Sequence, residues 1–210
     1  MKTRISLDAA VFLCAAALAS ANASAVSIDF ETLADGVAVT NQFAGAGLTF
    51  SNAISLKAGI SLNELEFPPH SGSVVVSDDG GPMTLLFASP VTKVSAFFTY
   101  AKPLTLTAWD AFGAFLGSTP SAFSANFTSS GVSGSAPNEF LELVLASGIS
   151  TSGISKLTVT GDAGGGSFVL DDLVFTPTAV PIPEPGTAAL MAIAVAGLLA
   201  RRRFAGSTVA

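Results

Sequence analysis

Charged residues, cysteine and histidine are all scarce in this 210-residue sequence. Only 11% of the residues are charged, and cysteine, histidine, tryptophan and tyrosine occur once each. Cys14 lies in an apolar N-terminal run that we expect to be removed, which leaves the mature protein without a disulfide or a thiol catalyst. Lipid modification of Cys14 is the alternative. The small residues that follow the run are typical of signal peptidase cleavage and favour removal.

Basic residues are rare in the middle of the chain. From Val26 to Ile182 there are four lysines and 13 acidic residues, so the net charge is 4 − 13 = −9. A surface of this charge repels phosphate backbones, and the sequence has no basic stripe, which argues against nucleic-acid binding. The other basic residues are Lys2, Arg4 and Arg201 to Arg203, at the two ends, where they set orientation in a membrane.

Few residues could support catalysis. His70 is the only histidine, it follows two prolines, and no G-x-S-x-G motif accompanies it. A zinc site with one histidine and no mature cysteine would need unusual carboxylate ligands. Glu64 and Glu66 could form a glycosidase pair, but their spacing alone implies no cleft. The sequence therefore predicts a protein that is not an enzyme and has no catalytic residues.

The N-terminus has the three parts of a secretory signal peptide. Lys2 and Arg4 precede an apolar stretch from Val11 to Ala19, and small residues follow it. We predict a signal peptide over residues 1–25, cleaved after Ala25 or, alternatively, after Ala23. A buried N-terminal helix is the competing interpretation, but strand-like sequence follows at once. The pattern implies the Sec translocon and signal peptidase as partners.

The C-terminus combines a proline-rich linker, an apolar run and an arginine cluster. Four prolines between residues 177 and 186 predict an extended connector. The run Thr187 to Ala200 would be about 21 Å long as a helix, against about 30 Å of bilayer hydrocarbon. Apolar residues on every face of this helix favour a membrane segment over a buried core helix. We predict a transmembrane helix over 187–200 and a cytoplasmic tail over 201–210, retained there by its arginines.

The order of these parts resembles a known sorting signal. Pro183, Glu184 and Pro185, the apolar run, and then Arg201, Arg202 and Arg203 are similar to the PEP-CTERM signal of Gram-negative bacteria. The resemblance spans residues 180–204. It implies an exported protein, held in the inner membrane until an exosortase processes it near the Pro-Glu-Pro motif, and then placed at the cell surface or outside the cell. Proteins with this signal are often linked to exopolysaccharide or biofilm.

The region between these ends has the pattern of an all-β protein. Short apolar or alternating runs are separated by Gly, Pro, Ser and Asp turn signals, and no segment keeps a helical period. We predict about nine to eleven strands over residues 26–176, arranged as an antiparallel, jelly-roll-like β-sandwich. The clearest predicted strands cover residues 27–31, 48–51, 74–77, 83–87, 94–100, 104–109, 140–146, 157–160 and 168–175.

Aromatic residues suggest a core and one candidate binding face. Phenylalanine accounts for 16 of the 18 aromatic residues, and at alternating strand positions it predicts core packing. Trp109 and Tyr100 flank a predicted hairpin around Lys102 and Pro103. Since tryptophan and tyrosine rings can stack on sugars, these two residues are candidates for carbohydrate binding.

Acidic residues at both ends of the predicted domain suggest a structural calcium ion. Asp29, Glu31 and Asp35 lie in or after the first strand, and Asp171 and Asp172 lie in the last. First and last strands commonly pair, which would gather the oxygen ligands that calcium prefers. These segments also resemble the opening and closing strands of carbohydrate-binding jelly rolls. We predict Glu31 and Asp172 as ligands, with Asp29, Asp35 or Asp171 as alternatives.

Together these features predict a non-enzymatic, exported β-sandwich of the cell surface or extracellular matrix. The alternative function is a carbohydrate-binding module that retains exopolysaccharide through Trp109 and Tyr100.

Overall fold

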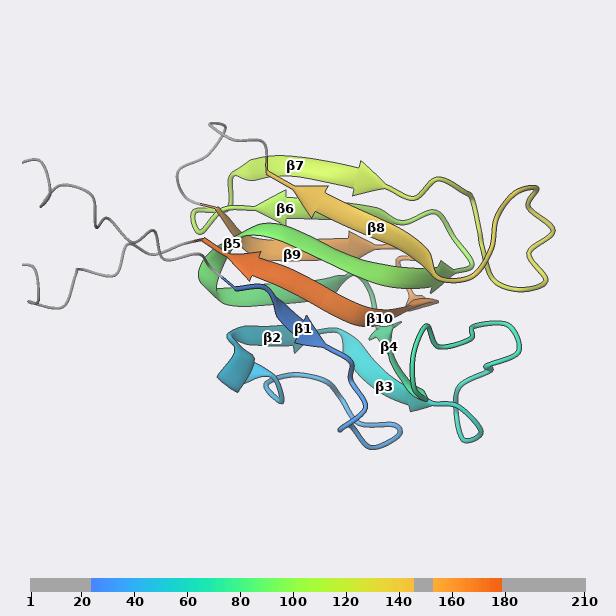
Figure 1. Ribbon diagram of the computed structural model, residues 1–210. Helices are drawn as coiled ribbons and strands as arrows, with labels where there is room; N and C mark the ends of the chain where they lie inside the picture. Colours follow the sequence, from blue (N-terminus) through green and yellow to red (C-terminus); the bar gives the residue numbers. More distant parts are fainter. Residues whose placement is uncertain (1–23, 146–152, 179–210) are drawn as a thin grey trace, which may run out of the picture. The chain divides into compact units, whose positions relative to one another are not determined.

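A computed structural model describes residues 24–145 and 153–178, which form an antiparallel β domain (Figure 1). The predicted signal peptide cleavage region before Ser24, the transmembrane helix and the arginine tail lie outside the described residues. The ten strands are β1 (Val26–Ile28), β2 (Leu48–Ser51), β3 (Ala53–Lys57), β4 (Val74–Asp79), β5 (Met83–Tyr100), β6 (Thr105–Trp109), β7 (Phe115–Pro120), β8 (Glu139–Val144), β9 (Ile154–Thr160) and β10 (Gly165–Pro177). Within the described residues, the one helical element is a 3-10 turn, η1 (Ala44–Ala46).

The long strand β5 belongs to two layers. Its first half pairs with β2 and β9, and its second half pairs with β8 and β10. The register shifts between Leu86 and Val91, where the strand doubles back (Figure 1). One layer therefore contains β2, β5, β9, β6 and β7, and the other contains β8, β5, β10, β4 and β3, with β1 beside β10. A strand that changes layer at an irregularity is how a sandwich turns a corner.

Alternate side chains of both layers form the core. Leu85, Leu106 and Leu157 point inward from the first layer, and Phe98 and Phe168 point inward from the second. The aromatic pairs within this core are mainly phenylalanines, as the sequence predicted. The all-β antiparallel β-sandwich is thus confirmed, and its ten strands fall within the predicted number.

A second, smaller core lies on the outer face of the second layer. Leu62 from the long β3–β4 loop packs against Val75 and Val169 on that face, and Phe67 of the same loop adds to the cluster. This packing holds the loop over β4 and β10. It places the end of the loop, residues 69–74, beside the acidic residues of β10.

Two strands and one connection differ from the sequence prediction. β3 was missed because polar Ser55 occupies a buried position, where its hydroxyl donates to the carbonyl of Ala34 at 2.6 Å. β7 was missed because Gly117 and Pro120 interrupt its pattern, which an edge strand tolerates. The predicted hairpin at Lys102 and Pro103 was wrong, since β6 pairs with β7 and β9 and not with β5.

Candidate functional site

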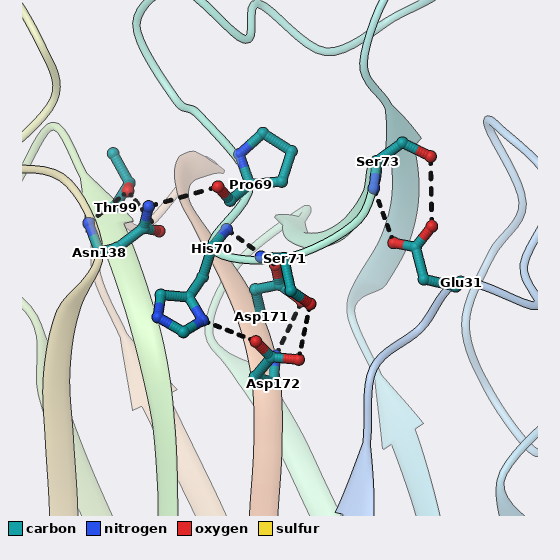
Figure 2. Close-up of polar contacts among 9 residues, drawn as sticks. All are labelled: Glu31, Pro69, His70, Ser71, Ser73, Thr99, Asn138, Asp171 and Asp172. Carbon is teal, nitrogen blue, oxygen red and sulfur yellow. Dashed lines mark hydrogen bonds and ion pairs between the residues drawn. The ribbon is translucent and has the colours of Figure 1, made fainter.

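The first and last strands pair, as the sequence predicted. β1 runs antiparallel to β10, with Ile28 opposite Leu173. Glu31 follows β1, while Asp171 and Asp172 lie within β10. All three carboxylates face one short segment, which we call the 69–74 loop (Figure 2).

Asp171 holds the first part of the 69–74 loop through its backbone. Its Oδ2 accepts hydrogen bonds from the amides of His70 at 2.8 Å and Ser71 at 2.9 Å. Its Oδ1 accepts a bond from the amide of Asp172 at 2.8 Å. The residue is 1% exposed. Burial raises the pKa of Asp171 above its ordinary value of 3.8, and the nearby Asp172 carboxylate adds to this, although the three amide donors act in the opposite direction.

Asp172 holds the side chains of the same two loop residues. Its Oδ2 lies 2.6 Å from Nδ1 of His70, and its Oδ1 accepts a hydrogen bond from Oγ of Ser71 at 2.9 Å. Asp172 has a φ of 48°, so the backbone leaves the regular strand here and turns the carboxylate toward the loop. The His70 ring stacks on Phe97 of β5, with ring centroids 3.4 Å apart and an angle of 7° between planes. His70 is therefore fixed by its amide, its Nδ1 and its ring face.

Glu31 holds the end of the 69–74 loop. Its Oε1 accepts hydrogen bonds from the amides of Ser73 at 2.9 Å and Val74 at 2.8 Å, and its Oε2 accepts one from Oγ of Ser73 at 3.2 Å. Partial burial would raise the pKa of Glu31, but these hydrogen bonds together lower it below its ordinary value of 4.5. Figure 2 shows Glu31 and the Asp171–Asp172 pair on opposite sides of the loop.

The two alternative acids hold other backbone groups. Oδ1 of Asp29 accepts a hydrogen bond from the amide of Glu31 at 3.2 Å. Oδ1 of Asp35 accepts one from the amide of Lys57 at 2.7 Å and another from the hydroxyl of Ser61. The five acids that the sequence singled out thus act as acceptors for protein donors around the start of the domain and its last strand.

This arrangement does not gather a calcium ligand set. Within residues 24–145 and 153–178, no three His, Cys, Asp or Glu side chains lie close enough together to hold a metal ion. Glu31 and Asp172 share the 69–74 loop as a partner, and their oxygens already accept protein hydrogen bonds. We therefore derive no calcium chemistry from these residues.

Calcium binding itself stays a prediction, and thermal unfolding tests it. A site present only in the native state would raise the melting temperature, so EGTA should lower it if the ion binds. Replacing EGTA with excess calcium should restore the original value. An unchanged melting temperature across both conditions would contradict calcium binding.

The two aromatic binding candidates are separated by the fold. Tyr100 has 0% exposure, and its hydroxyl contacts the carboxylate of Glu139. Burial, with the Glu139 hydrogen bond, raises the pKa of Tyr100 to about 12. A ring without exposed surface cannot stack on a sugar, so the assignment of Tyr100 to a binding face was wrong. Trp109 is partly exposed at the last residue of β6, where its ring contacts Phe115 edge-on, with ring centroids 6.0 Å apart.

Sequence reasoning missed the residues that make the 69–74 loop a defined structure. In the sequence, His70 is a candidate only for catalysis or zinc binding, and nothing in the sequence singles out Ser71 or Ser73. The partners of His70 and Ser71 lie about 100 residues away in sequence, and the partner of Ser73 lies 42 residues away. A proline pair followed by His-Ser-Gly-Ser was the one local signal of a constrained loop.

Comparison with known proteins identifies the C-terminal segment. The family model of the PEP-CTERM protein-sorting motif matches residues 181–203. The chain carries this sorting motif. The match contains the Pro183–Pro185 motif, the apolar run and Arg201 to Arg203, so the resemblance seen in the sequence is confirmed. A search of curated proteins finds no match to the chain.

The predicted membrane helix of the PEP-CTERM motif lies outside the described residues. In the part of the chain that the structure describes, no helix is long and apolar enough to cross a membrane. The transmembrane assignment of residues 187–200 therefore stays a prediction.

Several solved β domains have a distant likeness to the domain that precedes the PEP-CTERM motif. The K2 cleaved adhesin domain of Lys-gingipain is 17% identical, with 74% of this chain and 99% of that chain covered and a TM-score of 0.45. A DUF4465 family protein from Bacteroides caccae is 11% identical, covering 74% and 100%, with a TM-score of 0.46. The module TmCBM61, solved with β-1,4-galactotriose, is 15% identical, covering 67% and 99%, with a TM-score of 0.36. TM-scores below 0.5 identify neither a shared function nor a shared ligand.

Proposed function

We propose that this protein is exported through the Sec route, held in the inner membrane by its C-terminal helix, and processed by an exosortase near Pro183 to Pro185. The mature β-sandwich then works as a non-enzymatic component of the cell surface or extracellular matrix. One observation carries this proposal: the PEP-CTERM motif at residues 181–203 directly follows a β domain whose last strand ends at Pro177.

The limits of the folded domain support both processing steps. β1 begins at Val26, so cleavage after Ala25 would leave the first strand complete, and cleavage after Ala23 would add two residues. At the other end, the amide of Thr178 donates to the carbonyl of Pro90 at 2.8 Å. Cleavage near Pro183 therefore removes no residue of the strand ladder.

The arrangement at His70 supports a structural role over a catalytic one. Ser71 directs its hydroxyl to Asp172 and not to His70, and Asp172 and Phe97 hold the imidazole in place. These contacts describe a loop anchor. Carbohydrate binding through Trp109 is the second candidate function, and only Trp109 of its two predicted residues is accessible to a ligand.

Cell fractionation tests the proposed function. Wild-type protein should appear in the cell-surface or medium fraction, whereas a chain that lacks residues 1–25 should stay in the cytoplasm. The truncated chain retains every described strand, so its location reports export and not folding. Wild-type protein that fractionates with the cytoplasmic chain would contradict the proposal.

A further inference from the structure

One end of the domain holds the strand termini from which the chain leaves. β10 ends at Pro177, opposite Val91, and β9 begins at Ile154, opposite the same Val91. β1 begins at Val26, opposite Phe175. Figure 1 shows β1 starting and β10 ending on the same side of the domain. We call this region the linker end. It consists of residues 24–26, 43–48, 86–93, 109–115, 142–145, 154–156 and 176–178.

The β6–β7 hairpin presents phenylalanine to solvent at the linker end. Trp109 lies opposite Lys156, which is two residues from Ile154. The turn of this hairpin therefore lies at the linker end. Phe112 at the tip is 92% exposed, and Phe115 is 60% exposed. Oδ1 of Asp110 accepts hydrogen bonds from the amides of Phe112 and Ala114, both at 2.8 Å. These hydrogen bonds fix the turn in a conformation that exposes the Phe112 side chain to solvent.

The linker end differs from the rest of the domain in charge. Among the described residues it carries two lysines and two acids, Lys93, Lys156, Asp110 and Glu142, with a net charge of 2 − 2 = 0. Lys93 and Glu142 form an ion pair. The rest of the domain carries two lysines and 11 acids, a net charge of 2 − 11 = −9. The neutral linker end can therefore approach an anionic surface without strong repulsion.

Trp109 and Lys156 complete this surface. Nζ of Lys156 lies 5.0 Å from the centroid of the Trp109 ring. Tryptophan with a neighbouring lysine is typical of the interface between lipid headgroups and hydrocarbon, where the ring is half apolar and the ammonium reaches phosphate. The ammonium covers one face of the ring, so that face is not open for stacking on a sugar.

The length of chain that follows β10 limits how far this end can lie from the membrane. Eight residues, 179–186, separate Thr178 from the predicted membrane segment. Fully extended, they span at most about 28 Å. In the membrane-held precursor of the proposed function, on which this inference rests, the end of β10 is thus confined close to the bilayer.

We propose that the linker end is a lipid-contacting surface. In the precursor, the β6–β7 hairpin places Phe112 and Phe115 in the headgroup region of the bilayer, and Trp109 and Lys156 lie at its edge. The neutral linker end then faces the membrane, and the acidic remainder, including the 69–74 loop, faces away. The contact holds the short linker at the depth where a membrane enzyme can reach the Pro-Glu-Pro motif.

Fluorescence of Trp109 tests this proposal, because it is the only tryptophan in the whole chain. The full chain without its signal peptide is reconstituted in vesicles of phosphatidylethanolamine and phosphatidylglycerol, with or without brominated acyl chains. Brominated lipids should quench wild-type emission, and Phe112→Ser should lose most of this quenching. Phe140→Ser is the matched control, since Phe140 is also exposed, at 52%, but lies on β8 opposite Phe97, away from the linker end. Phe112→Ser should keep the wild-type melting temperature, and any decrease in Phe140→Ser would report the loss of its ring contact with Phe97, 5.2 Å between centroids.

The possible results distinguish a failure of the lipid contact from a failure of the membrane-held precursor. Chain that floats with vesicles but shows equal emission with brominated and ordinary lipids would overturn the lipid contact alone. Emission that shifts only on addition of exopolysaccharide, or only at high protein concentration, would assign the surface to a glycan or to a second copy and would also overturn it. Chain that does not float with vesicles at all would contradict the membrane-held precursor, and thus the proposed function itself.

Discussion

Replacing Asp171 with alanine should destabilise the domain by roughly 3 kcal/mol, because three backbone amides lose a buried, charged acceptor together. Two of these amides belong to His70 and Ser71, and the third to Asp172. For a domain of this size, such a loss lowers the melting temperature by roughly 6–12 °C. Differential scanning calorimetry measures it directly.

The matched control is Asp79→Ala. Asp79 is exposed at the end of β4, so its removal leaves no buried donor and should change the melting temperature little. Amide hydrogen exchange should accelerate at His70 and Ser71 in Asp171→Ala but not in Asp79→Ala. Equal melting temperatures for the two variants would contradict the anchoring role of Asp171.

Asp171 should also have a characteristic pH dependence. Its pKa is raised in the native state, so the native protein binds this proton more readily than the unfolded chain does. Its contribution to stability is fully present below the ordinary pKa of 3.8 and is lost as pH rises through the native pKa. Glu31 has a lowered pKa, and its contribution is present above 4.5 and lost as pH falls.

Because these two carboxylates act in opposite directions, the melting temperature should be compared between wild type and Asp171→Asn at each pH. The stability of wild type relative to the variant should be greatest at the most acidic pH and should decrease toward neutral pH. A difference that increases from acid to neutral pH would contradict the raised native pKa of Asp171.

The largest cellular effect should come from the sorting motif. A chain with Pro183→Ala, Glu184→Gln and Pro185→Ala should stay unprocessed and accumulate in the membrane fraction, because a motif-specific enzyme has lost its recognition sequence while the apolar run is intact. The substituted residues lie inside the matched segment, residues 181–203. Immunoblotting of membrane and surface fractions should show most of the variant in the membrane.

Ser207→Ala is the control for this variant, since it lies in the C-terminal tail beyond the matched residues. It should be processed as wild type is. Release of the triple variant to the surface at the wild-type level would show that Pro-Glu-Pro is not the recognised element.

The fold was predictable because most strands have a plain apolar pattern. Val74 to Ser77 and Phe168 to Phe175 are bounded by turn residues, and the structure has strands at both places. Pairing of the first and last strands followed from the closure of a sandwich. The sequence did not show that two predicted strands, 83–87 and 94–100, are halves of β5, because doubling back at Ala88–Val91 depends on which strands each half meets.

The site was less predictable, because many of its donors are backbone groups. From the pairing of the first and last strands, the sequence placed Glu31, Asp171 and Asp172 in one region and suggested calcium as their partner, which stays a prediction. In the structure, Glu31 and Asp171 accept hydrogen bonds from amides of the 69–74 loop, and a backbone amide has no signature in the sequence. Tyr100 shows the same limit: the acid that satisfies its buried hydroxyl, Glu139, lies 39 residues away.

The most direct test of export and sorting is the intact mass of the mature protein purified from cells, with sequencing of both ends. The account predicts an N-terminus at Val26 and a C-terminus near Pro183 to Pro185, without Arg201 to Arg203. A mature protein that begins at Met1, or that still ends at Ala210, would contradict it.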